Sequence, residues 1–159
     1  MVRKGNESLL ANHPYLHQVL IWDKQNSKYK NFRKLLKTIR SENYDLVINL
    51  QRFLSTGVLT AFSNAETKIG FRKNPMSLFF NKKLPHELNG THEVERNLSL
   101  IQHLTDDSFE MPKLHPSIQN FQKTSELLSN LNINPQKFIT IAPTSVWFTK
   151  QLPIKNGKR

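Results

Sequence analysis

The feature that most constrains the fold of this chain is the alternation of short apolar runs with helical patterns. The clearest run is YDLVINLQ, residues 44–51, which is almost continuously apolar between polar ends. Such runs are typical of strands buried on both faces of a parallel sheet. In the basic segment before it, residues 29–44, apolar residues from Phe32 to Ile39 recur at helical spacing between Lys and Arg. This spacing predicts an amphipathic helix.

The remaining segments continue the alternation. Further strands are expected at residues 17–23, 67–72 and 137–143. Further helices are expected at residues 6–14, 53–64, 91–104 and 118–133, with a polar, basic loop over 73–90 and a linker over 105–116. Because strands and helices alternate in short units, the sequence predicts an α/β fold, Rossmann-like, with a parallel sheet and right-handed crossovers.

The amino-acid composition limits the classes of function that are possible but does not select one of them. A hydrophobic fraction of 37% over 159 residues is enough for a folded core, which argues against wholesale disorder. The formal net charge of +11 indicates an anionic partner: nucleic acid, a phosphorylated substrate or an anionic membrane surface. The chain has no cysteine, which excludes disulfides and thiolate metal sites and is compatible with the cytoplasm. The histidines show no metal-ligand spacing, so no metal is expected.

Two sequence features predict where a ligand would bind. Ligands of parallel sheets bind at the carboxyl ends of the strands, which draws attention to the polar residues after each strand. The segment FITIAPTSVWFTKQLP, residues 138–153, runs from a predicted strand into Thr144, Ser145 and a lysine, Lys150. Hydroxyl and N–H donors with a nearby cation can hold a phosphate. The alternative is a hairpin or loop that carries a surface lysine.

Several motifs, in order and at the same spacing, resemble the lipopolysaccharide heptosyltransferases of glycosyltransferase family 9. They are YDLVINLQ, KIGFRKNPMSLFFNKKLP, HEVERNLSLI and IAPTSVWFTKQLP. The last is the most specific, since its Pro143, Trp147, Thr149, Lys150 and Pro153 fall in register with the family's turn. The resemblance runs from about residue 5 to residue 153.

The resemblance implies a partial GT-B fold. Residues 1–112 would be most of the N-terminal, acceptor-binding domain, and residues 113–159 a linker and the first helix and strand of the nucleotide-sugar domain. The implied reaction is metal-independent, inverting transfer of heptose from ADP-heptose to the lipopolysaccharide inner core, with no cofactor. The implied partners are this donor, a lipid A–Kdo or inner-core acceptor and the anionic surface of the inner membrane, on its cytoplasmic side.

The same resemblance assigns donor phosphate binding to four residues of the last turn: Thr144, Ser145, Thr149 and Lys150. The family's usual Gly-Ala pair is Thr144-Ser145 here, and its Pro before Thr149 is Phe148. The family's presumed general base, an Asp in a Gly-Asp turn, would lie upstream of this chain, so no catalytic residue is assigned. The resemblance therefore predicts an inactive fragment, truncated at both ends.

Acceptor binding is expected from three groups of residues, each with a structural alternative. Asn49 and Gln51 could contact sugar hydroxyls, or simply cap the end of a strand. The expected basic loop and the expected helix at 91–104 supply the other candidates, which are Arg72, Lys73, Lys82, Lys83, His92 and Arg96. The lysines and Arg72 could bind Kdo carboxylates or lipid A phosphates, or form a solvated loop. His92, Glu93 and Arg96 could form an acceptor cluster or only a helix-start salt bridge.

Two other classes of function stay open. The net charge and the basic helix would suit a small nucleic-acid- or anion-binding domain. Against nucleic acid, the lysines are spread along the chain and no recognition-helix or aromatic RNA-binding pattern is present. The chain could also be a remnant without a function of its own, since a sheet that lacks its first strand exposes an open edge.

Overall fold

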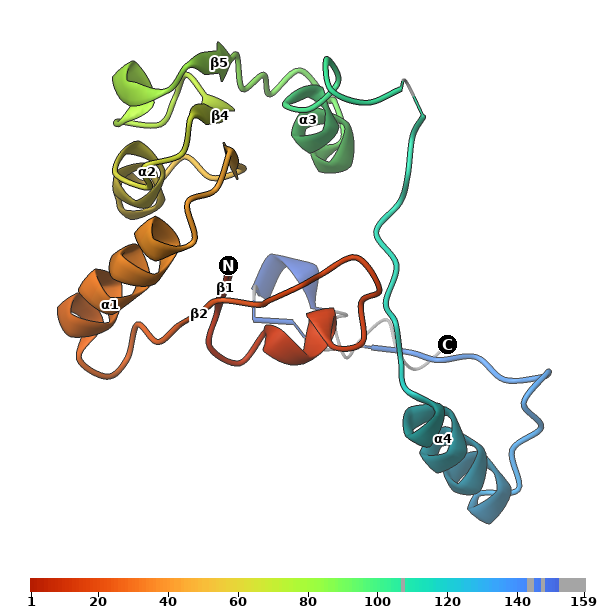
Figure 1. The fold of residues 1–159 in the computed structure, drawn as a ribbon. Helices are drawn as coiled ribbons and strands as arrows, with labels where there is room; N and C mark the ends of the chain where they lie inside the picture. The colour runs from red at the N-terminus through yellow and green to blue at the C-terminus, as the bar shows by residue number, and fades with distance from the viewer. Residues whose placement is uncertain (107, 143–144, 147, 152–159) are drawn as a thin grey trace. The chain divides into compact units, whose positions relative to one another are not determined.

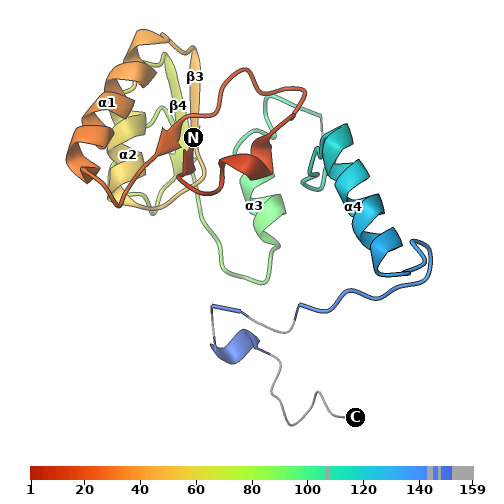
Figure 2. The same cartoon turned by 90° about the horizontal axis from the view of Figure 1, so that it is seen from below.

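The computed structural model describes residues 1–106, 108–142, 145–146 and 148–151. The chain divides into two compact units, Met1–His115 and Pro116–Arg159. Both units are shown in Figure 1, and Figure 2 gives a second view of each. Every strand among the described residues lies in the first unit.

The first unit holds a three-stranded parallel sheet. Its strands are β3 (Leu46–Asn49), β4 (Thr67–Phe71) and β5 (Lys82–Leu84), in the order β3-β4-β5. The register places Ile48 beside Ile69 and Gly70 beside Lys83. A second, two-stranded parallel sheet pairs β1 (Val2–Arg3) with β2 (Ile21–Trp22). The predicted α/β fold with parallel strands is confirmed.

Helices follow the strands as the periodicity predicts. They are α1 (Lys28–Ser41), α2 (Leu54–Ala61) and α3 (Glu93–Ser99) in the first unit and α4 (Ile118–Asn130) in the second. Short 3-10 turns occur at η1 (Glu7–Leu10), η2 (Ser77–Phe79) and η3 (Phe148–Lys150). Shortly after α1, α2 and α4 an asparagine takes a positive φ: Asn43, Asn64 and Asn132. Asparagine tolerates this left-handed geometry better than most residues, which explains why these helices stop there.

Two apolar clusters form the core of the first unit. Trp22, Leu35, Ile39 and Leu59 pack between β2 and the helices α1 and α2. Ile69, Phe71 and Leu100 form the second cluster, around β4 and the end of α3, and Ile48 and Leu84 pack against them. Each cluster joins residues far apart in sequence, so both depend on the parallel strand arrangement.

Three expectations about local structure were wrong. Residues 6–14 form only the short turn η1 rather than a helix. The expected basic loop at 73–90 contains β5, since Lys82–Leu84 pairs with β4 while the side chain of Lys83 stays exposed. The described part of the strand expected at 137–143 is not a strand. Its Ile139 is 88% exposed, and a strand without a neighbour to pair with is unstable.

Asp23 fixes the start of α1 to the small sheet. Its carboxylate accepts hydrogen bonds from Lys4 Nζ at 2.8 Å and from the backbone N–H groups of Gln25 and Asn26 at 2.9 and 3.1 Å. The Lys4 ammonium and these N–H groups hold the pKa of Asp23 well below its usual 3.8. This contribution to folding is complete above that usual pKa and is lost as the pH falls below it.

We therefore expect Asp23→Asn to lower the thermal unfolding midpoint at neutral pH. The difference from the wild type should shrink at about pH 2, because the wild-type carboxylate then loses part of its advantage. Thermal unfolding of both proteins, followed by circular dichroism at the two pH values, measures this. A difference that stays constant between them would show that the charge of Asp23 contributes nothing.

Candidate functional site

The carboxyl edge of the β3-β4-β5 sheet gathers polar residues. Because the three strands are parallel, their carboxyl ends lie at one edge of the sheet. Asn49 ends β3, Arg72 follows β4 directly, and His86 comes shortly after β5. Asn49 and His86 are each 5% exposed. Two of the three strand ends thus bury a polar side chain.

Asn49 shapes the turn that leaves β3. Its Oδ1 accepts a hydrogen bond from the backbone N–H of Gln51 at 2.9 Å, which is the strand-end capping that the sequence left open as an alternative. Its Nδ2 is buried without a hydrogen-bond partner, and a buried donor without a partner carries a desolvation cost. Gln51 itself is exposed. Capping therefore uses the acceptor of Asn49 and leaves its donor for another group.

Asn74 holds two loops of this edge together, and sequence reasoning missed it. Its Nδ2 donates to the carbonyl oxygens of Gln51 at 2.9 Å and Phe53 at 3.2 Å. Its Oδ1 accepts from the N–H of Met76 at 2.9 Å. The loop after β4 is thus tied to the loop after β3. Gly57 of α2 lies against this side chain, because a Cβ there would lie 2.1 Å from Asn74 Oδ1.

His86 was also missed, because the strand before it was assigned to a loop. Its ring meets that of Phe71 edge to face, with 4.7 Å between the ring centroids. Its Nδ1 is buried without a hydrogen-bond partner. Had Lys82–Leu84 been recognised as a strand, His86 would have stood out as a strand-end residue like Asn49.

The basic residues predicted for acceptor binding divide between a loop and a strand. Arg72 and Lys73 follow β4 and their side chains are exposed. The backbone of Arg72 is fixed, since its N–H donates to Leu84 O at 2.8 Å and its carbonyl accepts from Ser77 Oγ at 3.0 Å. Lys82 and Lys83 are not loop residues, because both lie in β5. Arg72 and Lys73 are therefore the two of this group at the carboxyl edge.

His92 and Arg96 are occupied in organising α3. Nδ1 of His92 accepts from the Val94 N–H at 3.3 Å, and the N–H of His92 donates to Glu95 Oε2 at 3.3 Å, which together form a capping box. Arg96 pairs with Glu93 at 2.5 Å and donates to Glu87 O at 2.7 Å. The helix-start salt bridge is present. The side chains of His92 and Arg96 therefore already have partners within the protein, and an acceptor would have to bind beside these contacts.

The predicted donor turn lies in the second unit. Thr144 is outside the described residues. Ser145 is half-buried and its carbonyl accepts from Gln151 Nε2 at 2.7 Å. Thr149 and Lys150 lie in η3, and both side chains are exposed. The described part of the turn therefore presents a hydroxyl and an ammonium group to the surroundings.

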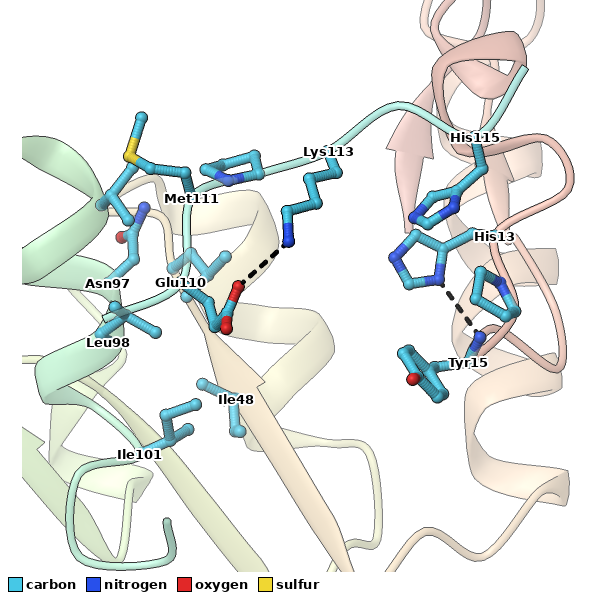
Figure 3. A pocket seen from close by; sticks show the side chains of 14 residues that line it. His13, Tyr15, Ile48, Asn97, Leu98, Ile101, Glu110, Met111, Lys113 and His115 are labelled. Atoms are coloured by element: carbon cyan, nitrogen blue, oxygen red, sulfur yellow. Dashed lines mark hydrogen bonds and ion pairs between the residues drawn. The ribbon is translucent and has the colours of Figure 1, made fainter. Parts of the chain in front are cut away.

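A cavity of about 940 Å³ opens beside α3 (Figure 3). Its wall is mostly apolar, with Ile48 from β3 and Leu98 and Ile101 from α3 and the turn after it. His13 and His115 both line it, and their rings meet edge to face with 4.6 Å between the centroids. None of the site residues predicted from the sequence lines it. A second hollow of about 410 Å³ does contain Asn49 and Gln51.

The fold and the strand-end residues define the class of the protein. A parallel, Rossmann-like sheet with polar and cationic groups at its carboxyl edge is typical of enzymes that bind phosphorylated or nucleotide ligands. The model of glycosyltransferase family 9 (heptosyltransferase) matches residues 32–157. The chain belongs to this family, which confirms the resemblance seen in its motifs.

Two curated proteins show how much of the family this chain represents. Lipopolysaccharide heptosyltransferase 3 of Escherichia coli strain K12 is 40% identical over 83 residues, which is 48% of this chain and 23% of that protein. A lipopolysaccharide heptosyltransferase 3 from Escherichia coli is 29% identical over 126 residues, 77% of this chain and 37% of that protein. The chain thus spans well under half the length of these relatives. No solved structure matches it.

No helix among the described residues is both long and apolar enough to cross a membrane.

Proposed function

We propose that this chain is part of a glycosyltransferase that moves heptose from ADP-heptose to the lipopolysaccharide inner core, without a metal and with inversion at the anomeric carbon. The family match over residues 32–157 carries the proposal. Residues 1–112 would bind the acceptor, and residues 113–159 would begin the nucleotide-sugar domain. The net charge of +11 supports contact with the anionic cytoplasmic face of the inner membrane.

In the proposed reaction an acceptor hydroxyl attacks the anomeric carbon of the donor opposite the diphosphate. The new C–O bond forms as the bond to the β-phosphate oxygen breaks, and ADP leaves. The hydroxyl proton passes to a carboxylate base, for which none of the 159 residues is proposed. Charge that develops on the leaving phosphate is stabilised by preorganised donors and cations. We assign this role to Thr144, Ser145, Thr149 and Lys150.

The acceptor carries carboxylates and phosphates, and the carboxyl edge of the sheet supplies the cations to meet them. Arg72 and Lys73 are exposed at that edge, and two hydrogen bonds fix the backbone of Arg72. An arginine on a fixed backbone can form paired hydrogen bonds with a carboxylate or phosphate. Asn49 and Gln51, at the neighbouring strand end, would contact sugar hydroxyls. Lys82, Lys83, His92 and Arg96 stay as candidates for the outer part of the acceptor site.

The proposal is tested by acceptor binding rather than by turnover, since we expect no product from the 159-residue polypeptide alone. Arg72→Ala and Lys73→Ala should each weaken binding of a soluble Kdo-bearing lipid A analogue about tenfold, as expected for one lost charge-assisted contact. Isothermal titration calorimetry measures this. Lys37→Ala, which removes an exposed charge from α1, is the matched control.

Three results would contradict all or part of the proposal. If Lys37→Ala weakens binding as much as Arg72→Ala, the net charge rather than a site attracts the ligand. If a single-stranded oligonucleotide binds more tightly than the acceptor analogue and its affinity falls steeply with salt, the chain is a nucleic-acid-binding domain. Heptose transfer by the polypeptide alone would also show that the base lies within these residues.

A further inference from the structure

The helix α1 carries a row of cations on the face opposite the core. Leu35 and Ile39 are buried in the first apolar cluster, and the half-buried Phe32 and Leu36 pack against it. At about 3.6 residues per turn, the other side of the helix presents five cations, all exposed: Lys30, Arg33, Lys34, Lys37 and Arg40. They follow the helix axis for about 15 Å, and we call them the α1 stripe. Both views show α1 at the outside of the first unit (Figure 1, Figure 2).

No acidic group compensates the α1 stripe in the part of the chain that the structure describes. The helix itself contains no Asp or Glu. The ion pairs among the described residues lie elsewhere and join Lys4 to Asp23, Arg96 to Glu93 and Lys113 to Glu110. Like charges three or four residues apart weaken a helix, and packing against the core uses only the apolar face of α1. A row of uncompensated cations that packing does not require indicates an anionic partner.

The side chains around the α1 stripe favour a lipid surface over nucleic acid. Tyr29 is 78% exposed beside the first turn of the stripe, and Lys28 Nζ lies 5.6 Å from the centre of its ring. Tyrosine rings next to lysines are typical of protein surfaces that lie at the level of lipid headgroups. Reading of bases by a helix commonly uses Asn or Gln. The amide of Asn31 in α1 is already used, since it donates to Asp23 O and Asn26 O.

We propose that the α1 stripe binds the phosphate headgroups of an anionic lipid bilayer, with α1 lying parallel to the bilayer surface. The inference rests on the proposed function for the choice of a membrane, because the acceptor in that proposal is a lipid. It adds the place of contact, which the net charge alone leaves open. The apolar face of α1 is occupied by the core, so the helix binds through charge rather than by insertion. Binding of this kind requires anionic lipid and weakens with salt.

The test measures binding of the 159-residue polypeptide to vesicles by co-sedimentation. The vesicles contain equal parts of phosphatidylglycerol and phosphatidylcholine, and phosphatidylcholine vesicles serve as the uncharged comparison. Lys30→Gln/Lys37→Gln removes two charges from the α1 stripe and keeps good helix formers. It should weaken binding to the anionic vesicles at least about tenfold, because each cation near such a surface contributes about fivefold. Circular dichroism confirms that the variant is folded.

A matched variant separates the α1 stripe from the net charge. Lys123→Gln/Lys137→Gln removes the same charge from two exposed sites outside α1 and should weaken vesicle binding less than about twofold. Equal losses for the two double variants, or unchanged binding of Lys30→Gln/Lys37→Gln, would overturn the inference. So would equal binding of the unmodified chain to both kinds of vesicle.

Two further probes separate this inference from the proposed function and from nucleic-acid binding. Lys30→Gln/Lys37→Gln should bind the soluble Kdo-bearing lipid A analogue like the unmodified chain, whereas Arg72→Ala should not. Loss of vesicle binding without any binding of the analogue would support the α1 stripe and contradict the proposed acceptor site. Normal analogue binding with no effect of the stripe variant on vesicles would do the reverse. A single-stranded oligonucleotide that displaces the protein from vesicles, and binds the stripe variant at least about tenfold more weakly, would assign the stripe to nucleic acid and overturn the inference.

Discussion

Phe71→Ala should destabilise the first unit by about 3–5 kcal/mol, the range for removing a fully buried aromatic side chain. Phe71 is 0% exposed and packs with Ile69 and Leu100 in the cluster around β4. Its ring also packs edge to face with the ring of His86, with 4.7 Å between the two centroids. Domains of this size are stable by only about 5–15 kcal/mol. The variant should therefore lose most of its folded population in mild denaturant.

Urea unfolding followed by far-ultraviolet circular dichroism measures the loss for Phe71→Ala. Phe71→Leu keeps most of the volume and should cost less than about 1.5 kcal/mol. Phe53→Ala, which truncates a side chain that is 67% exposed, should change stability by no more than about 0.5 kcal/mol. A loss below about 1 kcal/mol for Phe71→Ala would show that the sheet is not held by this cluster.

The strands and helices with strong patterns could be predicted from the sequence. The continuous apolar run at 44–51 became β3, and the basic amphipathic segment became α1. The weak point was β5. Its sequence Lys-Lys-Leu carries no apolar alternation, and only pairing with β4 makes it a strand. A strand that is defined by its neighbour leaves little signal in its own residues.

The opposite error occurred at residues 137–143, where local preference favours a strand. Phe138, Ile139 and Ile141 are strand-forming residues, yet they are 49%, 88% and 72% exposed. Residues that favour strands form one only where a neighbouring strand can pair with them and one face of the strand is covered. Local sequence can thus indicate what a segment would form in a complete sheet without showing what it forms here.

The candidate site could be predicted in position but not in detail. The rule that ligands bind at strand ends singled out Asn49 and Arg72 without a structure. Asn74 and His86 became visible only from burial and hydrogen bonding. Neither residue belongs to a periodic pattern, since each acts through contacts with a segment distant in sequence. The free donor of Asn49 likewise depends on three-dimensional geometry.

Gly57→Ala should destabilise the protein by about 1–3 kcal/mol, although alanine normally stabilises a helix interior by about 1 kcal/mol over glycine. The reason is that the new Cβ would lie 2.1 Å from Asn74 Oδ1, and Asn74 is fixed by its bonds to Gln51 and Phe53. Asn74→Ala alone should also cost about 1–3 kcal/mol, through the polar groups it leaves unpaired.

The double variant Gly57→Ala/Asn74→Ala distinguishes this clash from a general effect on α2. Truncating Asn74 removes the contacts of the added methyl group with Asn74 Oδ1 at 2.1 Å and Cγ at 3.0 Å and keeps the one with Met76 Cβ at 2.9 Å, so the cost of Gly57→Ala should fall by at least about 1 kcal/mol. Urea unfolding of the four proteins gives this coupling energy. Additive losses would mean that the two loops at the carboxyl edge are not joined through Asn74. A clear coupling would show that Gly57 is kept small so that Asn74 can hold the loop after β3, and with it Gln51, in place.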